Sequence, residues 1–318
     1  MQILLCPRCK HELDNGDQGL TCSSCQDFFP KQDGIISLFN PEADPDSFAS
    51  LEAKAHDDSA KISNEFMGSD LFHSENLHNL LCQQIAKHLS CDHKILELGS
   101  GGGRDIVTLA QLKYNHLSAS DVSLHAITQA KLLAEQKGVS DCITFYQLDG
   151  SHLPFKDQEF DAIFMVAALH HFQLTIEALK GIKRCCKTGG YIMAFVEPNC
   201  LYYRCVRPMA KIVEKIFSPF RRYREITRSI AEEKASGFTI PMFYEFAKEA
   251  GLEVVSIQSH WVLTGFIYLI QQFCFRILGK SSASFLNPLA KATCFIDDRL
   301  TKNKTSWCWH YSVIYRVL

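Results

Sequence analysis

Short apolar runs alternate with longer amphipathic stretches between about residues 75 and 200. The longer stretches repeat apolar side chains at helical spacing, as in Asp105–Leu112 and Ser123–Gln136. Runs of strand length that alternate with helical patterns are typical of a parallel sheet with crossover helices. The pattern predicts strands at Lys94–Leu98, His116–Ser120, Ile143–Gln147, Ala162–Val166 and Gly190–Val196.

The same pattern returns near the end of the chain. A helix is predicted at Met242–Ala250, with Gly251 as its stop, followed by a strand at Glu253–Ser259. Tyr311–Val317 reads as a last strand. With the five strands above, this predicts an α/β fold with seven strands.

Composition excludes several classes of protein. The chain has 318 residues, of which 47% are hydrophobic and 21% charged, so it can bury a core and is not disordered or fibrous. Its 33 Lys+Arg and 35 Asp+Glu leave a formal charge of −2, which gives no overall bias toward nucleic acid. Fourteen cysteines in a chain of this length, without signal-peptide character at Met1–Leu5, favour a reducing cytoplasm.

Four cysteines stand in two C-x-x-C pairs near the start of the chain. Two such pairs bring four thiolates to one point, as in a tetrahedral Zn²⁺ shell, and leave no open coordination position. The expected zinc is therefore structural, and it would supply the folding free energy that so short a segment lacks. The alternative is two redox or merely buried cysteine pairs. The four ligands would be Cys6, Cys9, Cys22 and Cys25.

This first segment resembles zinc ribbons found before some methyltransferases, and the small ribbon proteins that activate tRNA and release-factor methyltransferases. Beyond the cysteines, the resemblance rests on Leu13, Leu20, Phe29-Pro30 and Asp33-Gly34-Ile35-Ile36. An acidic, proline-bearing stretch follows, which is typical of a linker. The predicted division is a zinc ribbon at 1–41, a linker and helical segment at 42–74, and one larger domain at 75–318.

A glycine-rich turn follows the first strand of the larger domain. The sequence Glu97-Leu-Gly99-Ser-Gly101-Gly-Gly103 lets the backbone approach a ligand closely before a helix begins. Such a loop alone fits dinucleotides, nucleotides or S-adenosylmethionine. Asp121 after the second strand can accept from two ribose hydroxyls. Asp149-Gly150 after the third strand is not a dehydrogenase pattern.

The whole series resembles the class I S-adenosylmethionine-dependent methyltransferases, in the ubiquinone and menaquinone methyltransferase-like branch. The resemblance implies a Rossmann-like, doubly wound, mostly parallel seven-stranded sheet, with a lid insertion at about 200–240. It implies that Glu97 organises the cofactor loop of Gly99, Gly101 and Gly103, and that Asp121 binds the ribose. Val122 would pack on the adenine, whose edge would meet Asp149 and Gly150. The alternative for the aspartates is a helix cap or a turn.

Two histidines follow the fourth strand, where the methyl group would be transferred. His171, or failing it His170, is expected to line the acceptor pocket and act as a base, and the alternative is a hydrogen-bonded loop histidine. Glu197 after the fifth strand either orients the acceptor or is solvated. No Asn-Pro-Pro-Tyr-like motif follows the fourth strand, which favours methylation at oxygen or carbon.

A basic segment and an apolar segment remain outside this series. The stretch from Arg204 to Arg228 contains eight basic residues and only two glutamates. Trp261–Leu278 is apolar but is interrupted by Gln271, Gln272 and Arg276, so no transmembrane span is expected. Residues 200–235 and 261–278 could instead touch an anionic membrane surface, or be a solvated face and a packing helix.

The sequence therefore predicts methyl transfer from S-adenosylmethionine to a small molecule, possibly sugar- or lipid-linked. The first alternative is an RNA base methyltransferase, since ribosomal RNA guanine methyltransferases also carry a cysteine-rich zinc module. The all-cysteine shell and the position of the basic segment depart from that family. The second alternative is a non-catalytic protein that keeps the fold for binding.

Overall fold

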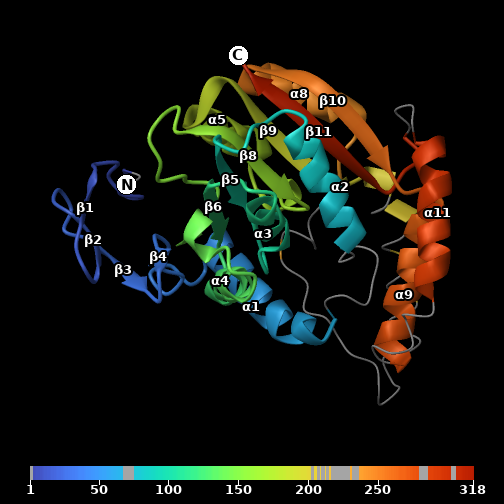
Figure 1. The fold of residues 1–318 in the computed structure, drawn as a ribbon, viewed down its shortest axis with the longest axis horizontal. Coiled ribbons are helices and arrows are strands. Elements are labelled where there is room, and N and C mark those ends of the chain that lie inside the picture. The colour runs from blue at the N-terminus through green and yellow to red at the C-terminus, as the bar shows by residue number, and fades with distance from the viewer. Residues whose placement is uncertain are drawn as a thin grey trace.

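The computed structural model describes residues 3–66, 75–201, 236–278, 286–301 and 306–318, with isolated positions between 204 and 230. The chain forms a twisted sheet with helices on both faces, and the N-terminal strands lie at one edge of it (Figure 1). The predicted basic segment 204–228 and the predicted lid at about 200–240 lie largely outside the described residues.

Seven strands form the central sheet, as predicted. Among these seven strands, the five that come first in the chain run parallel to one another. The one that comes last lies antiparallel between its two neighbours. In hydrogen-bonded order they are β7 (Ile143–Gln147), β6 (His116–Asp121), β5 (Lys94–Leu98), β8 (Phe160–Val166), β9 (Cys186–Pro198), β11 (His310–Val317) and β10 (Leu252–His260).

Two hydrophobic cores lie on opposite faces of this sheet. Neighbouring residues of one strand point to opposite faces, so Ile95 belongs to one core and Leu96 to the other. One face is covered by α2 (Glu75–Ala86), α3 (Arg104–Gln111) and α4 (Leu124–Gln136). The other is covered by α5 (Thr175–Cys185) and α8 (Ile240–Ala250). The sheet with helices on both faces confirms the predicted α/β class.

The N-terminal segment continues the same sheet. Its strands are β1 (Leu13–Asn15), β2 (Gly19–Cys22), β3 (Phe28–Gln32) and β4 (Ile35–Ser37). The last of these pairs in parallel with β7, where Ile36 faces Tyr146. Leu4 also bridges to Phe155 of the larger domain. The cysteine-bearing segment therefore covers what would otherwise be an exposed sheet edge.

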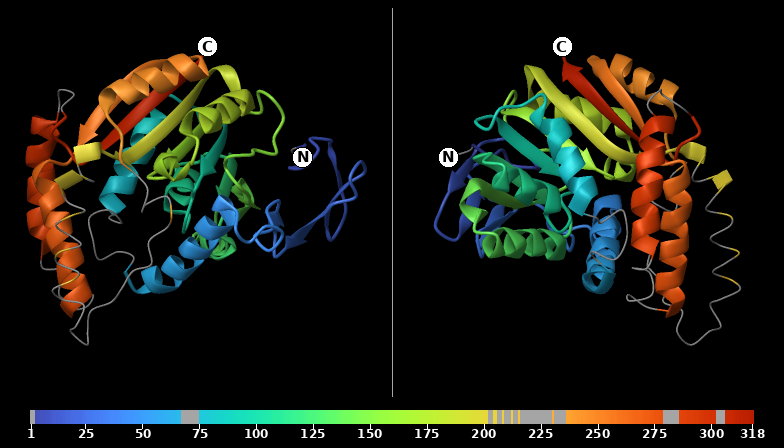
Figure 2. Two further views of the ribbon diagram at one scale, coloured as in Figure 1. Left: turned by 180° about the vertical axis from the view of Figure 1, so that it is seen from behind. Right: turned by 45° about the vertical axis from the view of Figure 1, so that its right-hand side comes forward.

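Helix α1 (Phe48–Phe66) follows the N-terminal segment and lies beside α4. Two short 3₁₀ helices, η1 (Ser140–Cys142) and η2 (Leu169–His171), lie beside strands of the sheet. At the far end from the N-terminal strands, α9 (Leu263–Leu278) and α11 (Asn287–Leu300) lie side by side (Figure 2). Among the described residues, the helices are too short or too polar to span a bilayer.

Candidate active site

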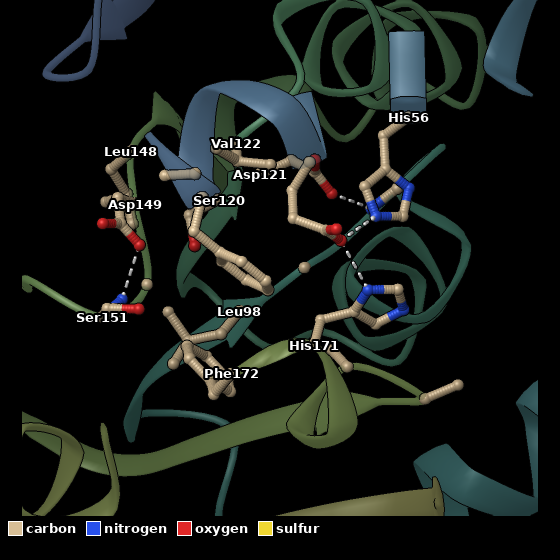
Figure 3. Close-up of a pocket in the computed structure, with 18 residues that line it drawn as sticks. His56, Leu98, Ser120, Asp121, Val122, Leu148, Asp149, Ser151, His171 and Phe172 are labelled. Atoms are coloured by element: carbon tan, nitrogen blue, oxygen red, sulfur yellow. Dashed lines mark hydrogen bonds and ion pairs between the residues drawn. The ribbon is translucent and has the colours of Figure 1, made fainter. Parts of the chain in front are cut away.

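A pocket of about 190 Å³ opens at the carboxyl ends of the parallel strands. This is the edge at which open α/β sheets bind their ligands. Its walls come from the ends of β5, β6 and β8, from the loop after β7, and from helix α1, which closes one side (Figure 3). The predicted residues that line it are Gly99, Gly101, Asp121, Val122, Asp149, Gly150 and His171.

The glycines of the first loop have different tasks. Gly99 and Gly101 line the pocket, and both have positive φ, a conformation that other residues rarely adopt. A side chain on Gly101 would meet no protein atom within 4 Å, so it would extend into free space beside the pocket. Gly103 lies outside the lining, and a Cβ there would come within 2.6 Å of the Cβ of Ala130 on α4. Gly103 thus permits helix packing.

Glu97 lies beneath this loop and does not reach the pocket lining. Its side chain is fully buried, and burial raises the pKa of its carboxyl well above the ordinary value, helped by the nearby carboxylates of Asp105 and Asp121. Asp105 is itself held by the Nδ1 atom of His78 at 2.8 Å. Glu97 therefore lies buried next to the loop without lining the pocket, and its role in organising the loop stays a prediction.

Asp121 links the glycine loop to the start of helix α4 at one side of the pocket. Its Oδ2 accepts a hydrogen bond from the Gly101 N–H at 2.8 Å, and its Oδ1 accepts from the Ser123 N–H at 2.9 Å. Ser123 in turn caps α4, since its Oγ accepts from the Ala126 N–H at 3.0 Å. A carboxylate oxygen has more than one lone pair, so Asp121 retains the capacity to accept from a ligand hydroxyl.

Asp149 and Gly150 form the wall opposite the glycine loop. The Oδ1 of Asp149 accepts from the Ser151 N–H at 2.9 Å, and its Oδ2 lies 3.1 Å from Nδ1 of His152. Gly150 lies close under the ring of Phe172, which a Cβ would approach to 3.0 Å. Asp149 therefore takes part in a turn and also lines the pocket, so the two alternatives for this residue do not exclude each other.

The two predicted histidines face different surroundings. His170 is held by Glu197, whose Oε2 lies 2.8 Å from its Nδ1. Glu197 is completely buried and also accepts from the backbone N–H groups of residues 168–170 at 2.8 to 3.1 Å. Of the two alternatives for Glu197, solvation is wrong: this carboxylate fixes the loop after β8.

His171 lies on the pocket wall, next to two side chains of helix α1. Its Nδ1 is 2.9 Å from Oε2 of Glu52, and the same oxygen lies 3.6 Å from Nε2 of His56. Figure 3 shows the rings of His56 and His171 on the same side of the pocket. No motif in the sequence points to Glu52 and His56. Their i,i+4 spacing, which places both on one helix face, is the signal that could have found them.

A second cavity of about 710 Å³ adjoins the first and shares Phe48 and Phe172 with it. It lies between the η2–α5 segment and α8, and His170 contributes to its wall. Aromatic or aliphatic and polar residues contribute equally to its lining, and the polar ones include the charged Glu177, Lys180 and Glu249. The apolar residues are Phe48, Phe172, Leu174, Ile176, Phe238, Met242 and Phe246.

The four predicted cysteine ligands converge in the N-terminal segment. The Sγ–Sγ distances are 3.6 Å from Cys6 to Cys25, 3.4 Å from Cys9 to Cys22 and 3.7 Å from Cys9 to Cys25. All four thiols are free. A tetrahedral ion with bonds of about 2.3 Å needs Sγ atoms about 3.8 Å apart, which fits this cluster.

A family profile described as "Methyltransferase domain" matches residues 96–194. The sterol 24-C-methyltransferase ERG6B of Gibberella zeae is 26% identical over 154 residues, which is 46% of this chain and 40% of that protein. The ubiquinone/menaquinone biosynthesis C-methyltransferase UbiE of Bartonella henselae is 30% identical over 109 residues, 33% of this chain and 42% of that protein. The chain thus spans less than half the length of these relatives.

The solved structures agree on the fold. The crystal structure of the [4+2]-cyclase SpnF matches with a TM-score of 0.56 at 16% identity, covering 85% of this chain and 96% of that one. At this identity the likeness concerns the fold alone. The profile match covers β5 to β9, which carry the glycine loop, Asp121 and Asp149. Residues 96–194 are thus similar in sequence to methyltransferase domains, and the fold of the chain agrees with that similarity.

Proposed function

We propose that the protein transfers the methyl group of S-adenosylmethionine to a small-molecule acceptor. The observation that carries this proposal is the meeting of Gly101, Asp121 and Asp149 around one pocket at the carboxyl edge of the sheet. When bound, the cofactor supplies an activated methyl group on its sulfonium. The residues then have to hold the donor and the acceptor in line, and to take up a proton where the acceptor loses one.

The pocket residues fit the cofactor's parts. Free space beside Gly101 admits a ligand close to the backbone, and Asp121 is placed to accept from the ribose hydroxyls. Val122 and Leu148 offer apolar contact to a base, and Asp149 lies at the rim where an adenine amine would donate. In this assignment Glu97 and Gly103 act on the loop from below, without touching the ligand.

The second cavity is the proposed acceptor site. It adjoins the cofactor pocket at Phe48 and Phe172, and its lining of apolar side chains beside polar and charged ones favours an acceptor that has both an apolar and a polar part. A quinone-like, isoprenoid or other lipid-linked molecule meets that description better than an RNA base in a polyanion. Methylation at oxygen or carbon remains the proposed chemistry.

Calorimetric titration of the metal-quantified protein with S-adenosylmethionine tests this function, followed by transfer of labelled methyl into cellular extracts. Label in the lipid or small-metabolite fraction is the expected result. Label in RNA would instead support the RNA methyltransferase. Absence of cofactor binding would support a non-catalytic protein.

We place His171 in activation of the acceptor, since it lines the cofactor pocket while His170 is held by Glu197. Replacing His171 by glutamine is expected to lower turnover by about 100-fold, within the usual range for a proton-transfer group. Cofactor affinity in the calorimeter should hardly change. Unaltered turnover of H171Q would remove the residue from the mechanism.

The four-cysteine cluster is the proposed site of a structural zinc ion. Its Sγ spacing fits a tetrahedral shell, and four thiolates leave no position open for catalysis. Fourteen free thiols also support a cytoplasmic location, where thiols stay reduced.

We further propose that α9 and α11 bring the protein to anionic membranes. These two helices expose Phe266, Ile270, Leu289, Phe295 and Leu300. In the sequence, the basic segment 204–228 would add attraction to anionic lipid. Together they suit a lipid-linked acceptor.

A vesicle experiment tests this surface. Phosphatidylglycerol-containing vesicles should co-sediment the protein, and the double substitution F266S/F295S should weaken binding by about 100-fold, because each buried phenylalanine contributes roughly 1.5–3 kcal/mol. The exposed Leu112 on the opposite part of the molecule serves as a matched control, in the substitution L112S. Equal sedimentation with and without vesicles would dismiss the membrane contact.

A further inference from the structure

Three side chains of types that commonly bind metal ions converge on the wall of the cofactor pocket. Oε2 of Glu52 lies 2.9 Å from Nδ1 of His171 and 3.6 Å from Nε2 of His56. All three ligand atoms lie within 4.8 Å of one another. Two of these residues are one turn apart on α1, and the third follows β8 far along the chain. The fold, not local sequence, assembles this group.

The spacing fits a first coordination shell. Nitrogen and carboxylate ligands lie about 2.0–2.2 Å from Zn²⁺, which places neighbouring ligand atoms roughly 3.0–3.5 Å apart. Oε2 of Glu52 lies 2.9 Å from Nδ1 of His171 and 3.6 Å from Nε2 of His56, just below and just above this range. Two imidazoles with one carboxylate are also a donor set that divalent transition metals favour, and the set leaves further positions open.

Burial and charge favour a cation at this point. The carboxylate side chain of Glu52 is only 6% exposed, and a buried carboxylate needs a positive partner. His56 is 38% exposed, so an ion could enter from solvent along α1. The cation would replace the proton that Glu52 and His171 share in their hydrogen bond.

We propose that Glu52, His56 and His171 bind one divalent transition-metal ion beside the cofactor pocket, distinct from the cysteine site. The role given to this ion rests on the proposed methyl transfer. All three residues line the cofactor pocket, so an acceptor oxygen that enters this pocket from the adjoining second cavity would take an open coordination position. The ion lowers the pKa of that oxygen and the proton passes to solvent. The oxygen then bonds to the methyl carbon while the carbon–sulfur bond breaks, and sulfur keeps the electron pair.

This site gives His171 a definite role and explains the position of α1. His171 would activate the acceptor as a metal ligand, in place of the free base expected from the sequence. The ion would also tie α1 to the loop after β8 across the pocket. Loading the site should therefore hold α1 in place over the cofactor.

Cobalt titration of full-length protein whose cysteine site is already filled with zinc tests this proposal. A second metal equivalent should appear with weak visible bands and no thiolate-to-cobalt charge transfer, because its ligands are nitrogen and oxygen. H56A and E52Q should weaken cobalt binding by about 10-fold or more, since even an outer partner of a ligand contributes that much. His116, an exposed histidine at the opposite end of β6, supplies the control H116A, which should bind cobalt as the unaltered protein does.

Two results would overturn the site. One is that the zinc-filled protein binds no cobalt, or binds it only by displacing zinc, with thiolate charge transfer. The other is unaltered cobalt affinity in both H56A and E52Q, where circular dichroism confirms that the variants fold. Cofactor titration of the same samples separates the two proposals: cofactor binding without cobalt binding ends only the metal site, whereas loss of cofactor binding in the unaltered protein ends the proposed function.

Discussion

Replacing Glu197 by alanine is expected to lower the free energy of unfolding by about 3–5 kcal/mol, the usual result of breaking a buried charged network. The two carboxylate oxygens accept from the backbone N–H groups of Ala168, Leu169 and His170 and contact the imidazole of His170. All of these partners would lose the acceptor that the completely buried Glu197 supplies. A small domain has only about 5–15 kcal/mol of stability in total.

The same substitution should also lower methyl transfer. The loop that Glu197 holds runs directly into His171 and Phe172, which line the cofactor pocket. A displacement of this loop by about 1 Å is enough to lose roughly 100-fold in rate, because the transfer depends on alignment. Cofactor affinity should fall less, since Asp121 and Asp149 belong to other strands.

Urea denaturation and single-turnover methyl transfer of E197A check both parts. The substitution E197Q is the matched control, because its amide keeps one acceptor oxygen and the side-chain volume while losing the charge. It should give an intermediate loss of stability. An E197A protein that unfolds at the same urea concentration as the unaltered chain would contradict the network's importance.

Features that depend on local sequence were predictable, and those that depend on tertiary pairing were not. The strands Lys94–Leu98 and Ile143–Gln147 are found with the predicted bounds, because a run of apolar residues between turns fixes both ends. β9 begins at Cys186 and not at Gly190. The strand continues through Gly189 and Gly190, and its pairing with β8 shifts in register there.

The site shows the same division. The pocket positions of Asp121 and Asp149 could be predicted because both lie at the carboxyl ends of strands, and parallel strands end at one edge. Glu97 and Gly103 flank the glycine loop, yet neither lines the pocket. Glu97 is buried, and Gly103 packs against α4. Glu52 could not be found in this way. It reaches His171 only because α1 crosses the edge of the sheet, and nothing in the local sequence records that crossing.

The sequences of β4 and β7, taken separately, likewise contain nothing that predicts their pairing. This pairing joins the cysteine-bearing segment to the sheet, so loss of the proposed zinc ion would affect more of the fold than it would in a separate module. The Leu38 N–H continues the pairing with a 2.8 Å hydrogen bond to the Gln147 carbonyl oxygen. The loop that carries Asp149 follows immediately, and the chain beyond Leu38 leads to Phe48 on the pocket wall.

Removal of the zinc ion, or the substitution C22S, is therefore expected to unfold the N-terminal segment and weaken cofactor binding together. Zinc contributes about 10–16 kcal/mol to the folding of small zinc peptides, more than a segment of this size can replace from its own core. Without it, β4 should separate from β7, and α1 should lose the anchor that precedes it.

Hydrogen exchange and calorimetry check this coupling in the full-length chain. After chelation, the amides of Ile36 and Leu38 should lose protection, and affinity for S-adenosylmethionine should fall by about 10-fold, because part of the binding energy must reorder α1. Cys91, an exposed thiol outside the cluster, gives the control C91S, which should behave as the unaltered protein does. Loss of the ion with full cofactor affinity would mean that the segment and the pocket are energetically independent. The paired strands argue against this, since β4 and the Asp149 loop meet at the end of one strand.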